Sequence, residues 1–158
     1  MAGSNSGGRG SPDVRSFRAA DADAVIAISK DSPESANWSK ESYLKMAEES
    51  GALALVIETE GMVTAFFAGR RIADQAEVFN LAVKQGHRRK GEASALMSAA
   101  LEEFGLQSVR SVYLEVRESN TGAIAFYERH GFAKTGRRKG YYQEPDEAAV
   151  TMKKELTG

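Results

Sequence analysis

The stretch Asn80–Leu101, with the sequence NLAVKQGHRRKGEASALMSAAL, decides the fold of this chain. It begins as an apolar strand that ends at Val83 and continues through a polar, basic loop, Lys84–Lys90. Gly91 then leads into a helix whose apolar residues stand at positions 93, 96, 97, 100, 101 and 104. This spacing is typical of an amphipathic helix with one buried face. The loop therefore connects two buried elements.

The same loop is a candidate anion site. A helix N-terminus carries unpaired N–H groups and about half a positive charge, so it binds anions readily. Arg88, Arg89 and Lys90 add three cations at the same place. The sequence therefore predicts a binding site for a phosphate-bearing ligand. Taken alone, the three cations are also typical of a solvated surface.

Length and composition are those of one globular domain. The 158 residues are 42% hydrophobic and 27% charged, which is ordinary for such a protein. No apolar run approaches the ~18 residues that a membrane span needs. The Gly- and Ser-rich residues 1–13 lack the apolar core of a signal peptide, and we expect them to be a disordered lead-in. We therefore expect a single domain, residues 14–158, in the cytoplasm and without a membrane partner.

The residue counts exclude several kinds of chemistry. The chain has no cysteine, so it has no thiol nucleophile, no thiolate metal site and no acyl-cysteine intermediate. Its two histidines, His87 and His130, are far apart in the sequence, which argues against a metal centre. We expect His87 in an exposed loop and His130 as a cation at a helix end. A net charge of −1 argues against a nucleic-acid partner.

The part before the central stretch is predicted to form a strand, two helices, a hairpin and a further strand. Residues 14–18 alternate as in a strand, and Asp21 is a candidate N-cap for the helix that follows. Ser39 is a candidate N-cap for the second helix, with Trp38 and Tyr43 placed as a hydrophobic staple. Two apolar runs at 53–58 and 62–71, joined by Thr-Glu-Gly, predict the hairpin, and 76–83 is the next strand.

The part after the central helix is predicted to form a strand, a helix and two strands. Residues 109–117 alternate, so Glu115 projects from the opposite face of the sheet to Leu114. A helix capped near Asn120 follows and ends at Gly131. A strand at 132–139, a loop that contains two tyrosines, and a strand at 148–154 complete a mixed α/β order.

Two segments resemble the signatures of a known superfamily. Residues 88–93, RRKGEA, are similar to the [Gln/Arg]-x-x-Gly-x-[Gly/Ala] pyrophosphate loop of the GNAT N-acetyltransferases. Residues 120–132, NTGAIAFYERHGF, are similar to the second signature, Asn-x-x-Ala-x-x-hydrophobic-Tyr-x-x-x-Gly-Phe. Because both come in the family's order and spacing, the chain is identified as a member. The resemblance implies the GNAT fold: a mixed, mostly antiparallel sheet with a splayed central strand pair and about four helices.

A narrower resemblance covers most of the chain from about Val14. Residues 37–39, 79–83, 115–117, 138–142 and 149–152 look like those of the ribosomal-protein-alanine N-acetyltransferases (RimI-type). Gln85, Glu92 and Ala148 depart from that family's pattern. The resemblance implies acetyl-CoA as the acetyl donor, a protein N-terminus as the acceptor, and direct transfer in a ternary complex without a metal. The alternatives are a small amine acceptor (an amino acid, a polyamine or an antibiotic) and a non-catalytic acyl-CoA sensor.

The resemblance also assigns residues to acetyl-CoA. Backbone groups of the central strand would meet the pantetheine arm, N–H groups of the loop would hold the pyrophosphate, and an asparagine would contact pantetheine. These residues are Leu81, Ala82, Val83, Arg88, Arg89, Lys90, Gly91, Glu92, Ala93, Ser94 and Asn120. A carboxylate beside an anion is unusual, and we expect the side chain of Glu92 to point to solvent, where the helix dipole favours an acid.

Two further side chains are implied to act in catalysis. Glu115 would take the proton of the acceptor amine, directly or through a water, and Tyr127 would protonate the departing thiolate. Without the resemblance, Glu115 is typical of a surface carboxylate and Tyr127 of a half-buried core tyrosine. Trp38, Tyr141 and Tyr142 are candidates for the wall of a peptide groove, with ordinary packing as the plain alternative.

Overall fold

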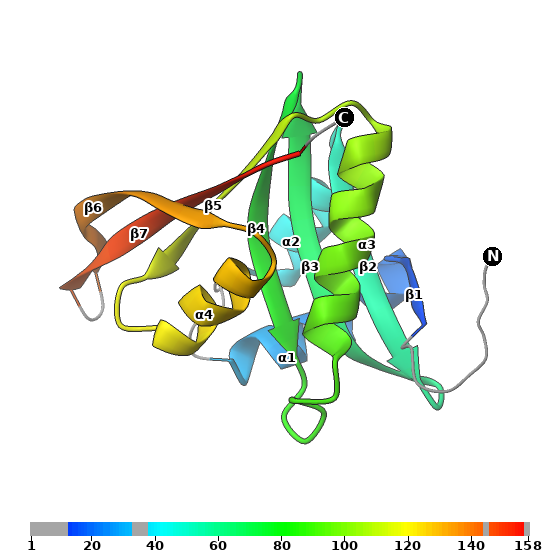
Figure 1. Ribbon diagram of the computed structural model, residues 1–158. Coiled ribbons are helices and arrows are strands. Elements are labelled where there is room, and N and C mark those ends of the chain that lie inside the picture. The colour runs from blue at the N-terminus through cyan, green and yellow to red at the C-terminus, as the bar shows by residue number, and fades with distance from the viewer. Residues whose placement is uncertain (1–12, 33–37, 144–145, 157–158) are drawn as a thin grey trace.

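The computed structural model describes residues 13–32, 38–143 and 146–156, so Asn37 and all of the predicted lead-in except Asp13 lie outside the described residues. The described strands form one sheet in the order β1-β2-β3-β4-β5-β7-β6 (Figure 1). The strands are β1 (Val14–Ser16), β2 (Ala52–Thr59), β3 (Met62–Ile72), β4 (Gln75–Val83), β5 (Ser111–Arg117), β6 (Ala133–Gln143) and β7 (Asp146–Glu155). The helices are α1 (Ala22–Lys30), α2 (Lys40–Ala47), α3 (Glu92–Leu106) and α4 (Thr121–Arg129), with a 3-10 turn, η2 (Ala19–Asp21). This order confirms the predicted mixed α/β fold.

Helices cover both faces of the sheet, and each face has its own core (Figure 1). On one face Phe104 of α3 packs with Phe67 of β3. On the other face Val25 of α1 and Tyr43 of α2 pack with Phe66. Phe66 and Phe67 enter different cores because side chains alternate across a strand. A strand buried on both faces has a continuous apolar run, which explains the composition of β3.

The central pair β4 and β5 is splayed, as predicted. The two strands run parallel and pair only over residues 75–77 and 111–113. Beyond that point β4 stays paired with β3 as far as Val83, while β5 stays paired with β7 as far as Arg117. Figure 1 shows β4 and β5 diverging, with α4 beside the open end. All other neighbouring strands in the described sheet are antiparallel.

A β-bulge in β4 accompanies this divergence. The register with β3 shifts between residues 68 and 69, which leaves Phe79 as an extra residue in β4. A bulge bends its strand and increases the local twist. Gly69 allows the close approach opposite the bulge, because a Cβ at this position would lie 2.6 Å from the carbonyl oxygen of Glu77. The bulge thus helps to turn the end of β4 away from β5.

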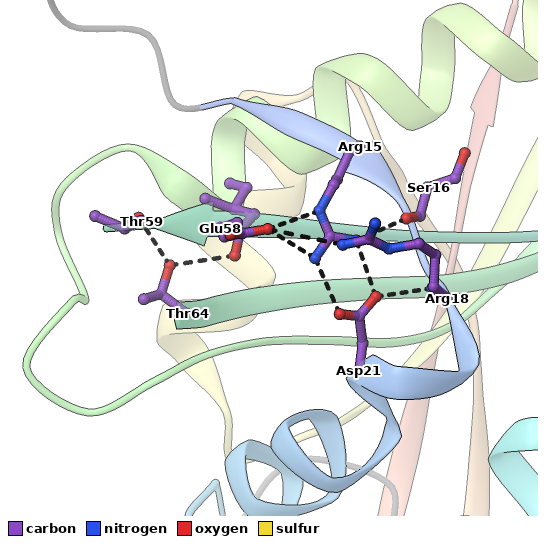
Figure 2. Close-up of polar contacts among 8 residues, drawn as sticks. Arg15, Ser16, Arg18, Asp21, Glu58, Thr59 and Thr64 are labelled. Carbon is purple, nitrogen blue, oxygen red and sulfur yellow. Dashed lines mark hydrogen bonds and ion pairs between the residues drawn. The ribbon is translucent and has the colours of Figure 1, made fainter. Parts of the chain in front are cut away.

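Asp21 ties the N-terminal strand to the sheet and does not cap α1, which corrects the prediction. Its carboxylate makes no capping bond to α1. It accepts two hydrogen bonds of 2.9 Å from Arg15 and one of 2.7 Å from the N–H of Arg18. Arg15 also donates to Glu58 of β2 at 3.0 Å (Figure 2). Asp21 is 6% exposed, and hydrogen bonding by Arg15 holds the pKa of its carboxyl below the usual value.

Asp21→Asn is expected to lower the free energy of unfolding by about 2 kcal/mol at neutral pH, because a charged, bidentate pair is lost. A carboxyl with a depressed folded-state pKa stabilises the fold above its unfolded pKa of about 4, and this contribution is lost as the pH falls through the folded-state pKa. Urea unfolding should therefore show a smaller difference between the two proteins at about pH 3.

The matched control is Asp23→Asn. Asp23 also stands in the first turn of α1, but its side chain is 84% exposed and pairs with Lys40 at the surface. This substitution should change the stability by less than about 0.5 kcal/mol. Equal destabilisation by Asp21→Asn at both pH values would contradict an electrostatic role for Asp21.

β6 is longer than the sequence predicted. A strand over 132–139 and a following loop with Tyr141 and Tyr142 were the expectation, whereas β6 includes both tyrosines. Pairing with β7 is interrupted after Arg138 and resumes at Tyr142↔Glu147. Gly140 lies in this interruption with a positive φ of 62°, which glycine adopts without strain. The segment predicted as a loop is therefore an irregular part of the strand β6.

Candidate active site

The loop before α3 presents a cradle of backbone N–H groups. Arg89 and Gly91 have positive φ angles of 67° and 82°, which turn the chain into the helix. Gly91 provides no side chain to cap α3, and the Ala95 N–H bonds the Gly91 carbonyl at 3.0 Å. The N–H groups of residues 92–94 therefore precede the bonded ladder of the helix. Such groups are well placed to bind an anion.

The three cations of the loop have different surroundings. Arg88 donates from Nε to the Val83 carbonyl at 3.1 Å and from Nη2 to the hydroxyl of Ser32 at 3.2 Å. Its guanidinium thus ties the loop to the chain after α1. Arg89 and Lys90 are exposed. All three side chains remain predicted phosphate ligands. To bind a phosphate, Arg88 would have to give up its hydrogen bonds to Val83 and Ser32.

Glu92 points inward, which corrects the expectation that its side chain faces solvent. It is 5% exposed and accepts a 2.9 Å hydrogen bond from the hydroxyl of Thr64. The hydroxyls of Thr64 and Thr59 are 3.2 Å apart (Figure 2). His87 Nδ1 lies 3.6 Å from the carboxylate, so this histidine is half-buried and not in an exposed loop. Glu92 fixes the start of α3 to the β2–β3 hairpin and offers its backbone N–H to the cradle.

The splayed edge of β4 exposes polar backbone groups. The Lys84 N–H donates to a carbonyl of β3 at 2.7 Å. Because peptide groups alternate in direction along a strand, those of Leu81 and Val83 face away from β3 and toward the opening. Those of Ala82 face β3. The Leu81 N–H bonds Asn80 Oδ1 at 3.1 Å, so a ligand that takes this donor must replace the asparagine.

The two ends of α4 carry further polar groups. Asn120 caps the helix as predicted, since its Oδ1 accepts from the Ala123 N–H at 3.1 Å. Its NH₂ group is a donor for the predicted pantetheine contact. At the other end His130 Nε2 lies 3.1 Å from the hydroxyl of Ser94 on α3. Burial, followed by two neighbouring cations, lowers the pKa of His130, so the predicted helix-end cation is disfavoured.

Glu115 lies in a pocket of about 320 Å³ where β4 and β5 part. Arg138 of β6 donates from Nη1 to its carboxylate at 2.5 Å, and this bond raises the pKa of Arg138. A hydrogen bond with Glu115 also raises the pKa of Tyr141. Glu77 lines the same pocket, and burial, together with the charge of Glu115, raises the pKa of its carboxyl. The candidate base therefore accepts a hydrogen bond from Arg138, and a second carboxylate lines the same pocket.

Glu77 and Arg138 were missed as members of this pocket. Alternation along the strand places Glu77 on one face of β4, but only the parallel pairing of β4 with β5 brings that face beside Glu115. Arg138 is brought beside Glu115 only by the strand order β5-β7-β6.

Tyr127 lies on the other side of the sheet from Glu115, against the core under α3 and α4. Its ring packs with Phe132 at 5.8 Å between centroids. Burial raises the pKa of Tyr127 to about 12, so the phenol stays protonated at neutral pH. Burial raises the pKa of Tyr142, and the guanidinium of Arg117, at the end of β5, lies 4.2 Å from the centre of the Tyr142 ring.

The aromatic side chains predicted for an acceptor wall lie on the face of the sheet that carries Glu115. Trp38 packs on Tyr43 and on Phe79, each at 5.8 Å between centroids, which confirms the hydrophobic staple. Tyr141 and Tyr142 pack edge to face at 5.0 Å. Their contribution to an acceptor groove stays a prediction.

No group of three or more metal-ligating His, Asp or Glu side chains is found among the described residues. None of the described helices is long and apolar enough to cross a membrane. The site that the described residues form consists of an N–H cradle, an open strand edge, a carboxylate pocket and the half-buried phenol of Tyr127.

This combination matches a known class of enzyme. The model of the acetyltransferase (GNAT) family matches residues 22–132. The chain therefore belongs to the GNAT acetyltransferase family and is an N-acetyltransferase.

Individual relatives show which members of the GNAT family this chain resembles. The [ribosomal protein bS18]-alanine N-acetyltransferase of Escherichia coli is 33% identical over 117 residues, which cover 73% of this chain and 78% of that protein. The crystal structure of the Escherichia coli ribosomal-protein-S18-alanine N-acetyltransferase has a TM-score of 0.81 at 28% identity, covering 92% of this chain and 96% of that one. Ard1 from Thermoplasma volcanium has a TM-score of 0.85 at 29% identity, covering 94% and 99%. The resemblance to the RimI-type enzymes is confirmed.

Proposed function

We propose that this enzyme transfers the acetyl group of acetyl-CoA to the α-amine of a protein N-terminus, with an alanine terminus of a ribosomal protein as the prototype. The observation that carries this proposal is the arrangement around the splay: β4 has an open edge and leads into the N–H cradle, and Glu115 projects from β5 just beyond the last residues that pair with β4. The activity of the Escherichia coli relative, a [ribosomal protein bS18]-alanine N-acetyltransferase, supports the acceptor class. The enzyme would act in the cytoplasm, where ribosomal proteins are made.

The donor side of the site fits acetyl-CoA by its hydrogen-bond donors. The N–H groups of residues 89–94, with Arg88, Arg89 and Lys90, suit a pyrophosphate. The peptide groups of Leu81 and Val83 suit the amides of pantetheine. Acetyl-CoA supplies an activated thioester, and backbone donors aimed at the oxygen that gains charge stabilise the transition state by ~3 kcal/mol.

The acceptor side of the site fits an amine. A peptide α-amine has a pKa of about 7.7–8, so much of it is protonated at neutral pH and a base is needed. Glu115 is the carboxylate in the pocket and takes that proton, directly or through a water. Tyr127, kept protonated by its raised pKa, donates toward the departing sulfur. An acyl-CoA sensor needs neither group, so their presence favours catalysis.

A small polyamine is the second candidate acceptor. Glu77 and Glu115 place two carboxylates in one pocket, and such a pair attracts an extended cation. Arg138 in the same pocket and the tyrosines beside it favour a peptide instead.

An acceptor panel tests the proposal by measuring thiol release from acetyl-CoA. The panel contains short peptides that begin with Ala, Ser, Met and Gly, an Nα-blocked lysine peptide, and spermidine. We expect turnover on the free Ala-type termini and none on the blocked peptide. Turnover on spermidine alone would move the enzyme to the small-amine class. Binding of acetyl-CoA without any turnover would favour the sensor.

Glu92→Ala is expected to raise KM for acetyl-CoA about fivefold with kcat little changed, because the first turn of α3 loses its anchor and the Thr64 hydroxyl loses its partner. Steady-state kinetics checks this. Glu102→Ala on the exposed face of the same helix should leave KM unchanged. If the two variants have the same KM, Glu92 does not position the cradle.

A further inference from the structure

Arg138 is the one cation in contact with Glu115 in the described chain, and its place follows from the sheet. Glu115 pairs with Thr151 of β7, and Arg138 pairs with Ala149 of the same strand. Arg138 reaches across β7, and its Nη1 lies 2.5 Å from the carboxylate. Both residues line the same pocket. The pocket thus presents a carboxylate and a guanidinium side by side, within one hydrogen bond of each other.

The local structure holds the guanidinium in this position. Its Cζ lies 4.6 Å from the centre of the Tyr141 ring, and an aromatic face attracts a planar cation. The interrupted pairing after Arg138, with Gly140 at a positive φ, sets the backbone between these two residues. The side chain remains 58% exposed, so an incoming ligand can reach it.

An α-amino terminus has the chemistry to satisfy both groups. Its nitrogen is a cationic donor, and the carbonyl oxygen of the same residue, three bonds away, is an acceptor. A guanidinium carries five N–H donors and accepts nothing, so it can bind this oxygen while the carboxylate holds the amine. A lysine side chain and a polyamine have only methylene groups at that distance, and they would leave the guanidinium without a partner.

We propose that Arg138 binds the carbonyl oxygen of the acceptor's first residue while Glu115 binds its amine, so that this pair selects α-amines over ε-amines and polyamines. This inference rests on the proposed function and adds the group that decides between its two candidate acceptors. The ion pair of the ligand-free enzyme is exchanged for two hydrogen bonds to substrate. Arg138 is a specificity-determining residue in this scheme, and Glu115 remains the base.

Arg137 offers a matched control. It stands next to Arg138 on β6, is exposed, and forms an ion pair of its own with Glu118, with bonds of 2.5 and 2.9 Å. Because neighbouring residues of a strand point to opposite faces, Arg137 lies on the face away from Glu115. Arg137→Met therefore removes the same charge and the same kind of ion pair without touching the pocket.

The test is a double-mutant cycle in which one change removes the Arg138 side chain and the other removes the carbonyl group of the substrate. Two acceptors are compared by kcat/KM: an Ala-terminated peptide, and the same peptide with a trans-alkene in place of its first amide, which keeps the shape but lacks the carbonyl. The wild type should prefer the amide about 30-fold, the worth of a hydrogen bond to a charged group. Arg138→Met should reduce this preference to within about threefold, Arg138→Lys should restore part of it, and Arg137→Met should keep all of it.

The possible outcomes separate this inference from the proposed function. If Arg138→Met slows both acceptors equally, Arg138 has only a structural role and the inference is wrong, while the proposed function stands. A wild type without preference for the amide would also overturn the inference. If the wild type acetylates no α-amine at all, the proposed function fails and the inference with it. Unchanged KM for acetyl-CoA and an unchanged Tm should accompany the expected result.

Discussion

Glu115→Gln should lower kcat on an Ala-terminated peptide about 10²-fold, with the affinity for acetyl-CoA unchanged. Glutamine keeps the shape of the side chain but cannot take a proton from the acceptor amine. The carboxylate lies in a pocket lined by the paired residues 75–77 of β4 and by no residue of the cradle, so the donor should bind as before. Steady-state kinetics with a separate measurement of acetyl-CoA binding separates the two effects.

The control for this prediction is Glu118→Gln. Glu118 follows β5 and pairs with Arg137 as Glu115 pairs with Arg138, but it does not line the pocket. The Glu118→Gln variant should therefore retain a normal kcat. The deficit of Glu115→Gln should also shrink as the pH rises above the amine pKa of about 8, where the acceptor is already neutral. Near-normal turnover at neutral pH would remove Glu115 from the mechanism.

Tyr127→Phe is expected to reduce kcat by a similar factor, about 10²-fold, with little change in KM for either substrate. The loss of one hydroxyl removes the donor for the departing sulfur. Because burial raises the pKa of Tyr127 to about 12, the phenol stays protonated well above neutral pH. The kcat of the wild type should therefore show no alkaline fall from this group below about pH 10, which a pH–rate profile measures.

Tyr43→Phe is the matched control for Tyr127→Phe. Tyr43 is a second tyrosine in the apolar interior, 1% exposed, and within the described residues its hydroxyl has no hydrogen-bond partner. The loss of that hydroxyl should leave kcat unchanged. If both variants lose activity equally, the effect comes from packing and not from proton donation. If Tyr127→Phe turns over normally, another group serves the sulfur.

Features with a local cause were predictable from the sequence. The apolar positions expected for the helix after Gly91 are buried or half-buried in α3, because a period of 3.6 residues places them on one face. Ser39 and Asn120 cap α2 and α4 as expected, since an N-cap bond joins residues only three apart. The splay followed from the family resemblance.

Features that depend on the packing of distant segments were not predictable. Glu92 obeys the rule for an acid in a first turn, yet its side chain is buried because Thr64, from another strand, provides a hydroxyl partner. Asp21 stands where an N-cap is expected, but a bidentate bond from Arg15 takes its carboxylate. A charge-assisted pair is stronger than a single capping bond. Arg138 depends on strand order, which a single sequence does not reveal.

The three-residue contact between β4 and β5 divides the proposed chemistry along the chain. Every group assigned to acetyl-CoA except Asn120 comes before that contact closes at residues 111–113, and both candidate catalytic groups come after it. Substitutions after this contact can therefore change which amine is acetylated, while the residues before it continue to bind acetyl-CoA. A fold arranged in this way can diversify its acceptors in evolution by changing one terminal portion of its sequence.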